Sequence, residues 1–98
     1  MGDPILAGAT RVRPSTGTLS RVLDGEAVLL GTTTARYYGL DPVGTHIWSL
    51  VGAGEDLDGV TRGVVREYEV AEPQAREDVY ALIADLLKHG LIEVITDR

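Results

Sequence analysis

A chain of 98 residues with fifteen acidic and nine basic side chains forms one domain, and its net charge of −6 disfavours phosphate backbones and acidic membrane surfaces as partners. It has no cysteine, which excludes disulfides and thiolate metal sites, and no apolar run approaches the roughly 18 residues of a membrane-spanning helix. The first residues, Met1 to Leu6, lack the basic start and long apolar stretch of a secretory signal, so we expect a cytoplasmic protein.

The N-terminal part of the sequence changes character near residue 18. Residues 1–17 contain prolines and glycines without a sustained pattern, which predicts a flexible arm with one short extended piece at residues 11–13. The domain itself is expected over residues 18–98. Two apolar runs then flank the turn dipeptide Asp24-Gly25, and a third run contains two neighbouring tyrosines, which suit a pleated surface. The three runs predict an antiparallel meander over residues 19–23, 27–30 and 35–40.

Beyond residue 40 the apolar period changes from two to about 3.6, which indicates helices. Asp41-Pro42 and Glu72-Pro73 are start signals, since an acidic side chain can cap a helix and proline suits its first position. Gly90 is the expected stop of the last helix. We predict helices over residues 41–52, 57–68 and 72–89 and a closing strand over 91–95. The order predicts an α+β fold of the winged helix-turn-helix type, with a three-stranded meander, three helices and a short C-terminal strand.

Few polar groups are placed to converge on a reaction. His46 and His89 lie on different predicted helices without a ligand at metal-binding spacing beside them. No serine has the context of a nucleophile elbow, and no phosphate-binding loop is complete. We therefore expect a protein that is not an enzyme and has no catalytic residue, metal site or cofactor.

The third predicted helix has a wider apolar surface than one neighbouring helix would cover. One stripe, formed by Ala75, Val79, Leu82 and Leu86, accounts for a core face. A second stripe, rotated by about one residue step, is formed by Arg76, Tyr80, Ile83 and Leu87. This second stripe either packs on the sheet or lines a groove beside it, and the sequence leaves both possibilities open.

The third predicted strand lies at a sheet edge if the meander pairs in sequence order. Such an edge leaves backbone groups unpaired, and Arg36 is the one charge that protects it. An extended peptide can add to such an edge as a further strand. Tyr37 and Tyr38 point to opposite faces by strand alternation, and the sequence does not decide which of them faces inward.

These parts and their order resemble the PqqD-like family, whose members are also called RiPP recognition elements. The resemblance rests on LDGEAVLL at residues 23–30, RYYGLDPVGTHIWSL at 36–50, VREYEV at 65–70 and LLKHGLI at 86–92. It covers residues 19–95, most of the chain.

The resemblance implies a protein that binds the leader segment of a ribosomally made precursor peptide, held as an added strand between the third strand and the third helix. Carried over by position, Arg76 would pair with an acidic leader side chain; the alternative is a surface salt bridge that contributes little. The implied peptide-binding residues are Ala35, Arg36, Tyr37, Tyr38, Gly39 and Leu40 on the strand, and Arg76, Val79, Tyr80, Ile83 and Leu87 on the helix.

Tyr37-Tyr38 and Ile47-Trp48 make the chain more similar to the lasso-peptide members of the family than to those of pyrroloquinoline quinone synthesis. The lasso version implies delivery of the leader to a separate leader peptidase, a transglutaminase-like cysteine protease, before a macrocyclase acts. The alternatives are a PqqD-type peptide chaperone and an acidic winged-helix DNA-binding or regulatory protein. The few cations of the third helix argue against the latter, so no nucleic-acid partner is expected.

Overall fold

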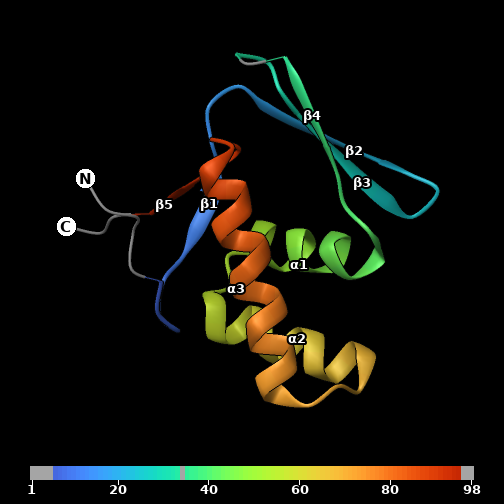
Figure 1. Cartoon of the computed structure of the whole chain (residues 1–98), viewed down its shortest axis with the longest axis vertical. Coiled ribbons are helices and arrows are strands. Elements are labelled where there is room, and N and C mark those ends of the chain that lie inside the picture. Colours follow the sequence, from blue (N-terminus) through green and yellow to red (C-terminus); the bar gives the residue numbers. More distant parts are fainter. Residues whose placement is uncertain (1–5, 34, 96–98) are drawn as a thin grey trace.

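The computed structural model describes residues 6–33 and 35–95 of the chain. The elements in chain order are β1 (Val12–Pro14), β2 (Thr18–Leu23), β3 (Glu26–Gly31), β4 (Arg36–Gly39), α1 (Pro42–Gly52), α2 (Leu57–Tyr68), α3 (Glu72–Lys88) and β5 (Ile92–Val94) (Figure 1). The predicted α+β class is confirmed, as is the order of a meander, three helices and a short C-terminal strand.

The meander forms one sheet in the order β2-β3-β4, with both strand pairs antiparallel. Asp24 and Gly25 have positive φ angles of 53° and 81°. Two-residue hairpin turns require such angles, because only then does the turn follow the twist of the two strands. The inward side chains of β3, Ala27 and Leu29, are fully buried. The opposite face of the sheet is open, and Leu19 on β2 is 57% exposed there. Strand alternation therefore gives β3 one packed face, whereas β2 is exposed along most of its length: Val22, which lies opposite Ala27, is 61% exposed.

Local signals define the ends of the helices. A carboxylate oxygen of Asp41 accepts a hydrogen bond from the Gly44 amide at 2.7 Å, so the predicted start of α1 is confirmed. At the start of α3 the cap is Ala71, which makes no side-chain hydrogen bond, and Glu72 is the first helical residue rather than the cap. Gly90 follows the C-cap of α3 with a φ of 71°, the left-handed conformation expected of it.

Within the N-terminal segment, where we expected a flexible arm with one short extended piece at residues 11–13, the structure has the strand β1. Strand β1 pairs antiparallel with β5, and Val12 is 3% exposed within the core (Figure 1). The Leu57 amide donates to the Thr10 carbonyl at 3.0 Å, which ties the preceding loop to α2. The described residues of this segment therefore pack on the domain that we expected over residues 18–98. A local sequence pattern cannot predict this pairing, because Arg13 and its partner Glu93 are 80 positions apart. Residues 1–5 of the predicted arm lie outside the residues that the structure describes.

The core lies where the three helices meet the inner face of the sheet and the β1–β5 pair. Its buried side chains come from every element except β2 and β4: Val12, Ala27, Leu29, Ile47, Val51, Leu57, Val60, Val64, Ala75, Val79, Ile83, Leu86 and Ile92, together with Leu40 and Leu91 next to elements. The buried hydroxyl of Thr61 donates to the Leu57 carbonyl at 2.8 Å, which satisfies it within α2. None of the described helices is long and apolar enough to cross a membrane.

Candidate binding groove

Strand β4 forms an open edge of the three-stranded sheet. The Leu40 amide donates to the Ala27 carbonyl at 2.8 Å, which fixes the alternation of the β3–β4 ladder. The backbone groups of Tyr38 and Arg36 therefore face β3, and those of Tyr37 and Gly39 face outward. Within residues 6–33 and 35–95 no strand pairs with this outer side of β4, so the predicted edge position is confirmed.

A groove of about 460 Å³ lies beside this edge, between β4, the start of α1 and α3. Most of its lining residues are apolar or glycine, polar and apolar groups both reach its surface, and its two charged residues are both acidic. The lining residues are Tyr38, Gly39, Leu40, Asp41, Val43, Gly44, Ile47, Asp78, Ala81 and Leu82. Leu40 and Ile47 are nearly buried and form the floor, whereas Leu82 is half-buried. The groove thus places apolar surface directly next to unpaired strand backbone.

Tyr38 is the tyrosine that faces α3. Its hydroxyl donates to the carboxylate of Asp85, and its ring meets the His89 ring edge to face at a centroid distance of 5.5 Å. Burial, reinforced by the hydrogen bond to Asp85, raises the pKa of Tyr38 to about 12, so the phenol keeps its proton and remains a donor. Tyr37 points to the other face of the sheet and is 76% exposed.

A smaller pocket of about 220 Å³ lies at the other end of β4. It is lined by Arg36, Tyr37, Tyr38, His89 and Leu91. His89 Nδ1 lies 2.8 Å from the Asp85 carbonyl oxygen, so the imidazole is held at the end of α3. Tyr38 lines both the groove and this pocket, and the two together follow the seam between β4 and α3.

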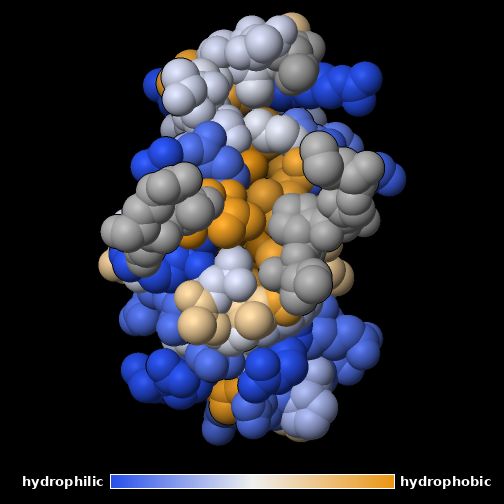
Figure 2. Space-filling model, turned by 90° about the vertical axis from the view of Figure 1, so that its left-hand side faces the viewer, coloured by the Kyte–Doolittle hydropathy of each residue, from blue (hydrophilic) through white to orange (hydrophobic). Residues whose placement is uncertain are grey.

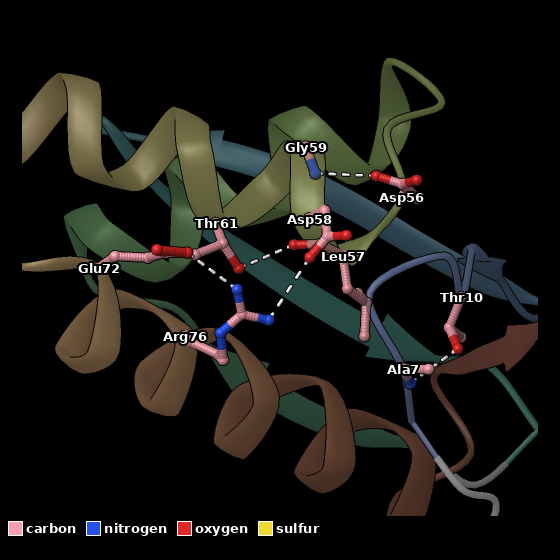
Figure 3. Close-up of polar contacts among 9 residues, drawn as sticks. All are labelled: Ala7, Thr10, Asp56, Leu57, Asp58, Gly59, Thr61, Glu72 and Arg76. Carbon is pink, nitrogen blue, oxygen red and sulfur yellow. Dashed lines mark hydrogen bonds and ion pairs between the residues drawn. The ribbon is translucent and has the colours of Figure 1, made fainter.

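The predicted helix contributors lie outside the groove lining. Val79 and Ile83 are fully buried in the core, so their side chains are not available to a ligand. Arg76 points toward α2, with its guanidinium 3.4 Å from Asp58 and 2.9 Å from Glu72 (Figure 3). Tyr80 lines a separate pocket with Arg76, Glu72, Pro73 and Glu77. Leu87 shares the flank of Arg76 and Tyr80 by helical spacing, which is not the flank that carries Asp78 and Leu82.

The residues that α3 does contribute to the groove are Asp78, Ala81 and Leu82. The sequence assigned Leu82 to the core stripe, because a helical wheel gives relative angles and not the positions of neighbouring elements. One signal could have located this flank. Asp78 and Asp85 lie on either side of Leu82 at a spacing of seven, and two carboxylates there indicate a flank that reaches solvent.

The residues that the structure describes include no group of three or more His, Cys, Asp or Glu side chains that could hold a metal ion. Carboxylates among these residues instead accept from cations, hydroxyls and backbone amides, as Glu93 does from Arg13 at 2.7 Å and Asp41 from the Gly44 amide at 2.7 Å. A ligand at the seam can therefore pair with the backbone of β4, contact apolar side chains and interact with charged ones.

Comparison with known proteins gives one family match and similar solved structures. Residues 26–92 match the model of a family described as coenzyme PQQ synthesis protein D (PqqD). The solved structure of TbiB1 in complex with the TbiA(beta) leader peptide is similar to this chain, with 33% identity, a TM-score of 0.80, and coverage of 87% of this chain and 99% of that chain.

Lasso peptide synthetase B1 complexed with the leader peptide has the same fold, with a TM-score of 0.79 at 24% identity over 85% of this chain and 98% of that chain. None of the curated proteins compared with the chain matches it. The family match spans more than half of the sequence and contains β3, β4, all three helices and the groove between them. The chain therefore belongs to the PqqD family, as the strings in its sequence suggested.

Proposed function

We propose that this chain binds the leader segment of a ribosomally made precursor peptide, in a lasso-peptide pathway, by adding it to β4 as a fourth strand. The observation that carries this proposal is the open edge of β4 lying next to a groove whose floor is apolar. The leader passes to a separate leader peptidase, and the chain itself performs no chemical step.

Backbone and side chains have separate roles in this binding. The outward amides and carbonyls of Tyr37 and Gly39 pair with the guest strand and supply affinity that depends little on sequence. Guest side chains that face α3 enter the groove and contact Leu40, Ile47 and Leu82, which supplies selectivity. TbiB1, which is 33% identical to this chain, is bound to a leader peptide, and this supports the proposal.

We propose that the leader contacts residues 36–40 on the strand side of the groove and Asp78, Ala81 and Leu82 on α3. Ala35 precedes β4 with a φ of 56° and marks the turn before the strand, so the added strand begins to pair beyond it. Delivery is an effect of position, because a held leader raises the local concentration of precursor at the peptidase. The proposed partners are a transglutaminase-like cysteine protease and, after cleavage, a macrocyclase.

Fluorescence polarisation tests the binding. The probes are the labelled TbiA(beta) leader and the labelled leader of any precursor peptide encoded next to the gene of this chain. We expect saturable binding to the folded chain at concentrations on the order of micromolar. Absence of binding for both probes at roughly tens of micromolar would remove the proposal.

A substitution at the edge locates the guest. Gly39→Pro removes an outward amide and places a ring at the edge, which proline tolerates in an edge strand, so we expect leader affinity to fall by about tenfold. Gly39→Ala is the matched control: it keeps the amide, and its added Cβ meets nothing within 4 Å. Both variants should keep the wild-type circular dichroism. Equal leader affinity of the proline variant and the wild type would place the guest elsewhere.

Cleavage assays test delivery. Precursor is incubated with this chain, with the peptidase, and with both. We expect leader cleavage to accelerate only in the mixture, because the adaptor supplies position and the peptidase supplies the nucleophile. Cleavage by this chain alone would contradict a non-catalytic role.

A further inference from the structure

The seam between β4 and α3 carries charges of opposite sign at its two ends. The charged residues that line the groove at the Leu40 end are Asp41 and Asp78, and no cation lines it. The pocket at the other end is lined by the fixed cation of Arg36 and by no carboxylate. Asp85 lies between the two, where it accepts a hydrogen bond from the Tyr38 hydroxyl and lies 3.6 Å from His89. The seam therefore changes from acidic to basic along β4.

Arg36 and Asp78 have no charged partner within the described part of the chain, whereas Asp41 caps α1 by accepting a hydrogen bond from the Gly44 amide. No carboxylate of the described residues forms an ion pair with Arg36, whereas Arg13 and Arg76 both have carboxylate partners. Asp78 accepts a hydrogen bond from the neutral amide of Gln74 at 3.0 Å and has no cationic partner among them. The seam thus ends in charges that a guest can pair with.

The strand geometry aligns the charges with one face of a guest. Arg36, Tyr38 and Leu40 share a face of β4 by alternation, and Tyr38 shows that this face meets α3. Arg36 and Leu40 are four residues apart, about 13 Å along a strand. A guest strand on β4 has the same spacing, so two of its residues four apart point to the same face.

We infer that the groove reads a pair of opposite charges in the leader, a Lys or Arg opposite Asp41 and Asp78 and, four residues away, an Asp or Glu opposite Arg36. This inference rests on the proposed function. All strand pairs in the structure are antiparallel, and antiparallel pairing is slightly more stable per residue. An antiparallel guest meets the Leu40 end of β4 first, so the cation precedes the anion in the leader.

The charge pair sets register and direction more than affinity. Ion pairs at a half-exposed site are worth a few-fold in affinity at most and weaken with salt. The backbone bonds of β4, however, are equivalent for guests shifted by two residues, and such a shift keeps the same side chains facing inward. Opposite charges at the two ends break that equivalence, because a shifted or reversed guest loses both ion pairs.

Peptides with moved charges test the inference. A series of leader peptides carries Lys and Glu four residues apart, in either order, at successive positions of an otherwise neutral segment. Fluorescence polarisation at low salt should find one position at which Lys before Glu binds about fivefold more tightly than Glu before Lys. The difference should shrink in about 0.5 M NaCl.

Charge-reversed protein variants complete the experiment. Arg36→Glu combined with Asp78→Lys keeps the net charge of the chain and should prefer Glu before Lys. The control, Arg21→Glu combined with Glu77→Lys, makes the same charge changes at exposed positions outside the groove lining and should keep the wild-type preference. If the wild type and both variants bind leader peptides with no preference for the order of Lys and Glu, the inference is wrong and the proposed function stands. If the wild type binds none of the leader peptides, both are wrong.

Discussion

At the scale of single residues, neighbours on α3 have different roles. Ile83 is fully buried between the helices, whereas Leu82 is half-buried and lines the groove. The angle between successive residues of a helix is about 100°, enough to separate a core position from a site position. A functional reading of this helix therefore depends on burial and not on hydrophobicity.

Alanine substitutions should separate these two roles. Ile83→Ala leaves a cavity in the core, so we expect the free energy of unfolding to fall by about 2–5 kcal/mol. Leu82→Ala should lower the free energy of unfolding by less, about 1 kcal/mol, and weaken leader binding several-fold. Urea unfolding and fluorescence polarisation measure the two effects. Similar stability losses in both variants would contradict the burial difference.

At the scale of elements, Gly90 lies in the middle of the three-residue connection between α3 and β5. The Leu91 amide donates to the Leu86 carbonyl at 3.0 Å, which closes the helix end around Gly90. The left-handed turn directs Ile92 into the core and β5 toward β1. Local backbone conformation at one position thus decides where the last strand lies.

Alanine at Gly90 should cost stability for a conformational reason alone. Its added Cβ meets nothing within 4 Å, so the φ of 71° is the sole penalty. We expect Gly90→Ala to lower the free energy of unfolding by about 1–2 kcal/mol. Gly52→Ala is the control, because its Cβ is equally free and its φ is not positive; we expect a gain of up to about 1 kcal/mol. Thermal unfolding measures both, and the same sign in both variants would contradict the argument.

At the scale of the whole molecule, the two ends of the described chain meet. Strands β1 and β5 pair beside α3, and apolar side chains gather on the face of the molecule that Figure 2 presents. The Ile95 amide donates to the Arg11 carbonyl at 2.8 Å, which extends the pairing beyond β5. The described part of the N-terminal segment therefore packs on the domain and supports it.

Truncation tests this role. A chain that begins at Thr18 lacks Val12 and exposes the edge of β5, so we expect its free energy of unfolding to fall by at least about 2 kcal/mol. A chain that begins at Leu6 keeps β1 and should unfold at nearly the wild-type temperature. Circular dichroism during heating compares them. Equal melting temperatures would support the boundary at residue 18 that the sequence indicated.

The sequence by itself determined the elements, their order and the family. The Asp24-Gly25 turn, the Asp41 cap and Gly90 act through the backbone conformation of a few neighbouring residues, which a local pattern can encode. The open edge of β4 was also predictable, because short connections make consecutive strands pair in order.

Only the tertiary structure decided which flank of α3 faces β4, which of Tyr37 and Tyr38 faces inward, and that β1 pairs with β5. Each of these depends on contacts between residues far apart in the chain. Both flanks of α3 are partly apolar, and alternation gives opposite faces to the two tyrosines without naming the inner one. The period of a helix or strand determines the directions of its side chains relative to one another. Packing between elements determines which of those side chains face a neighbouring element.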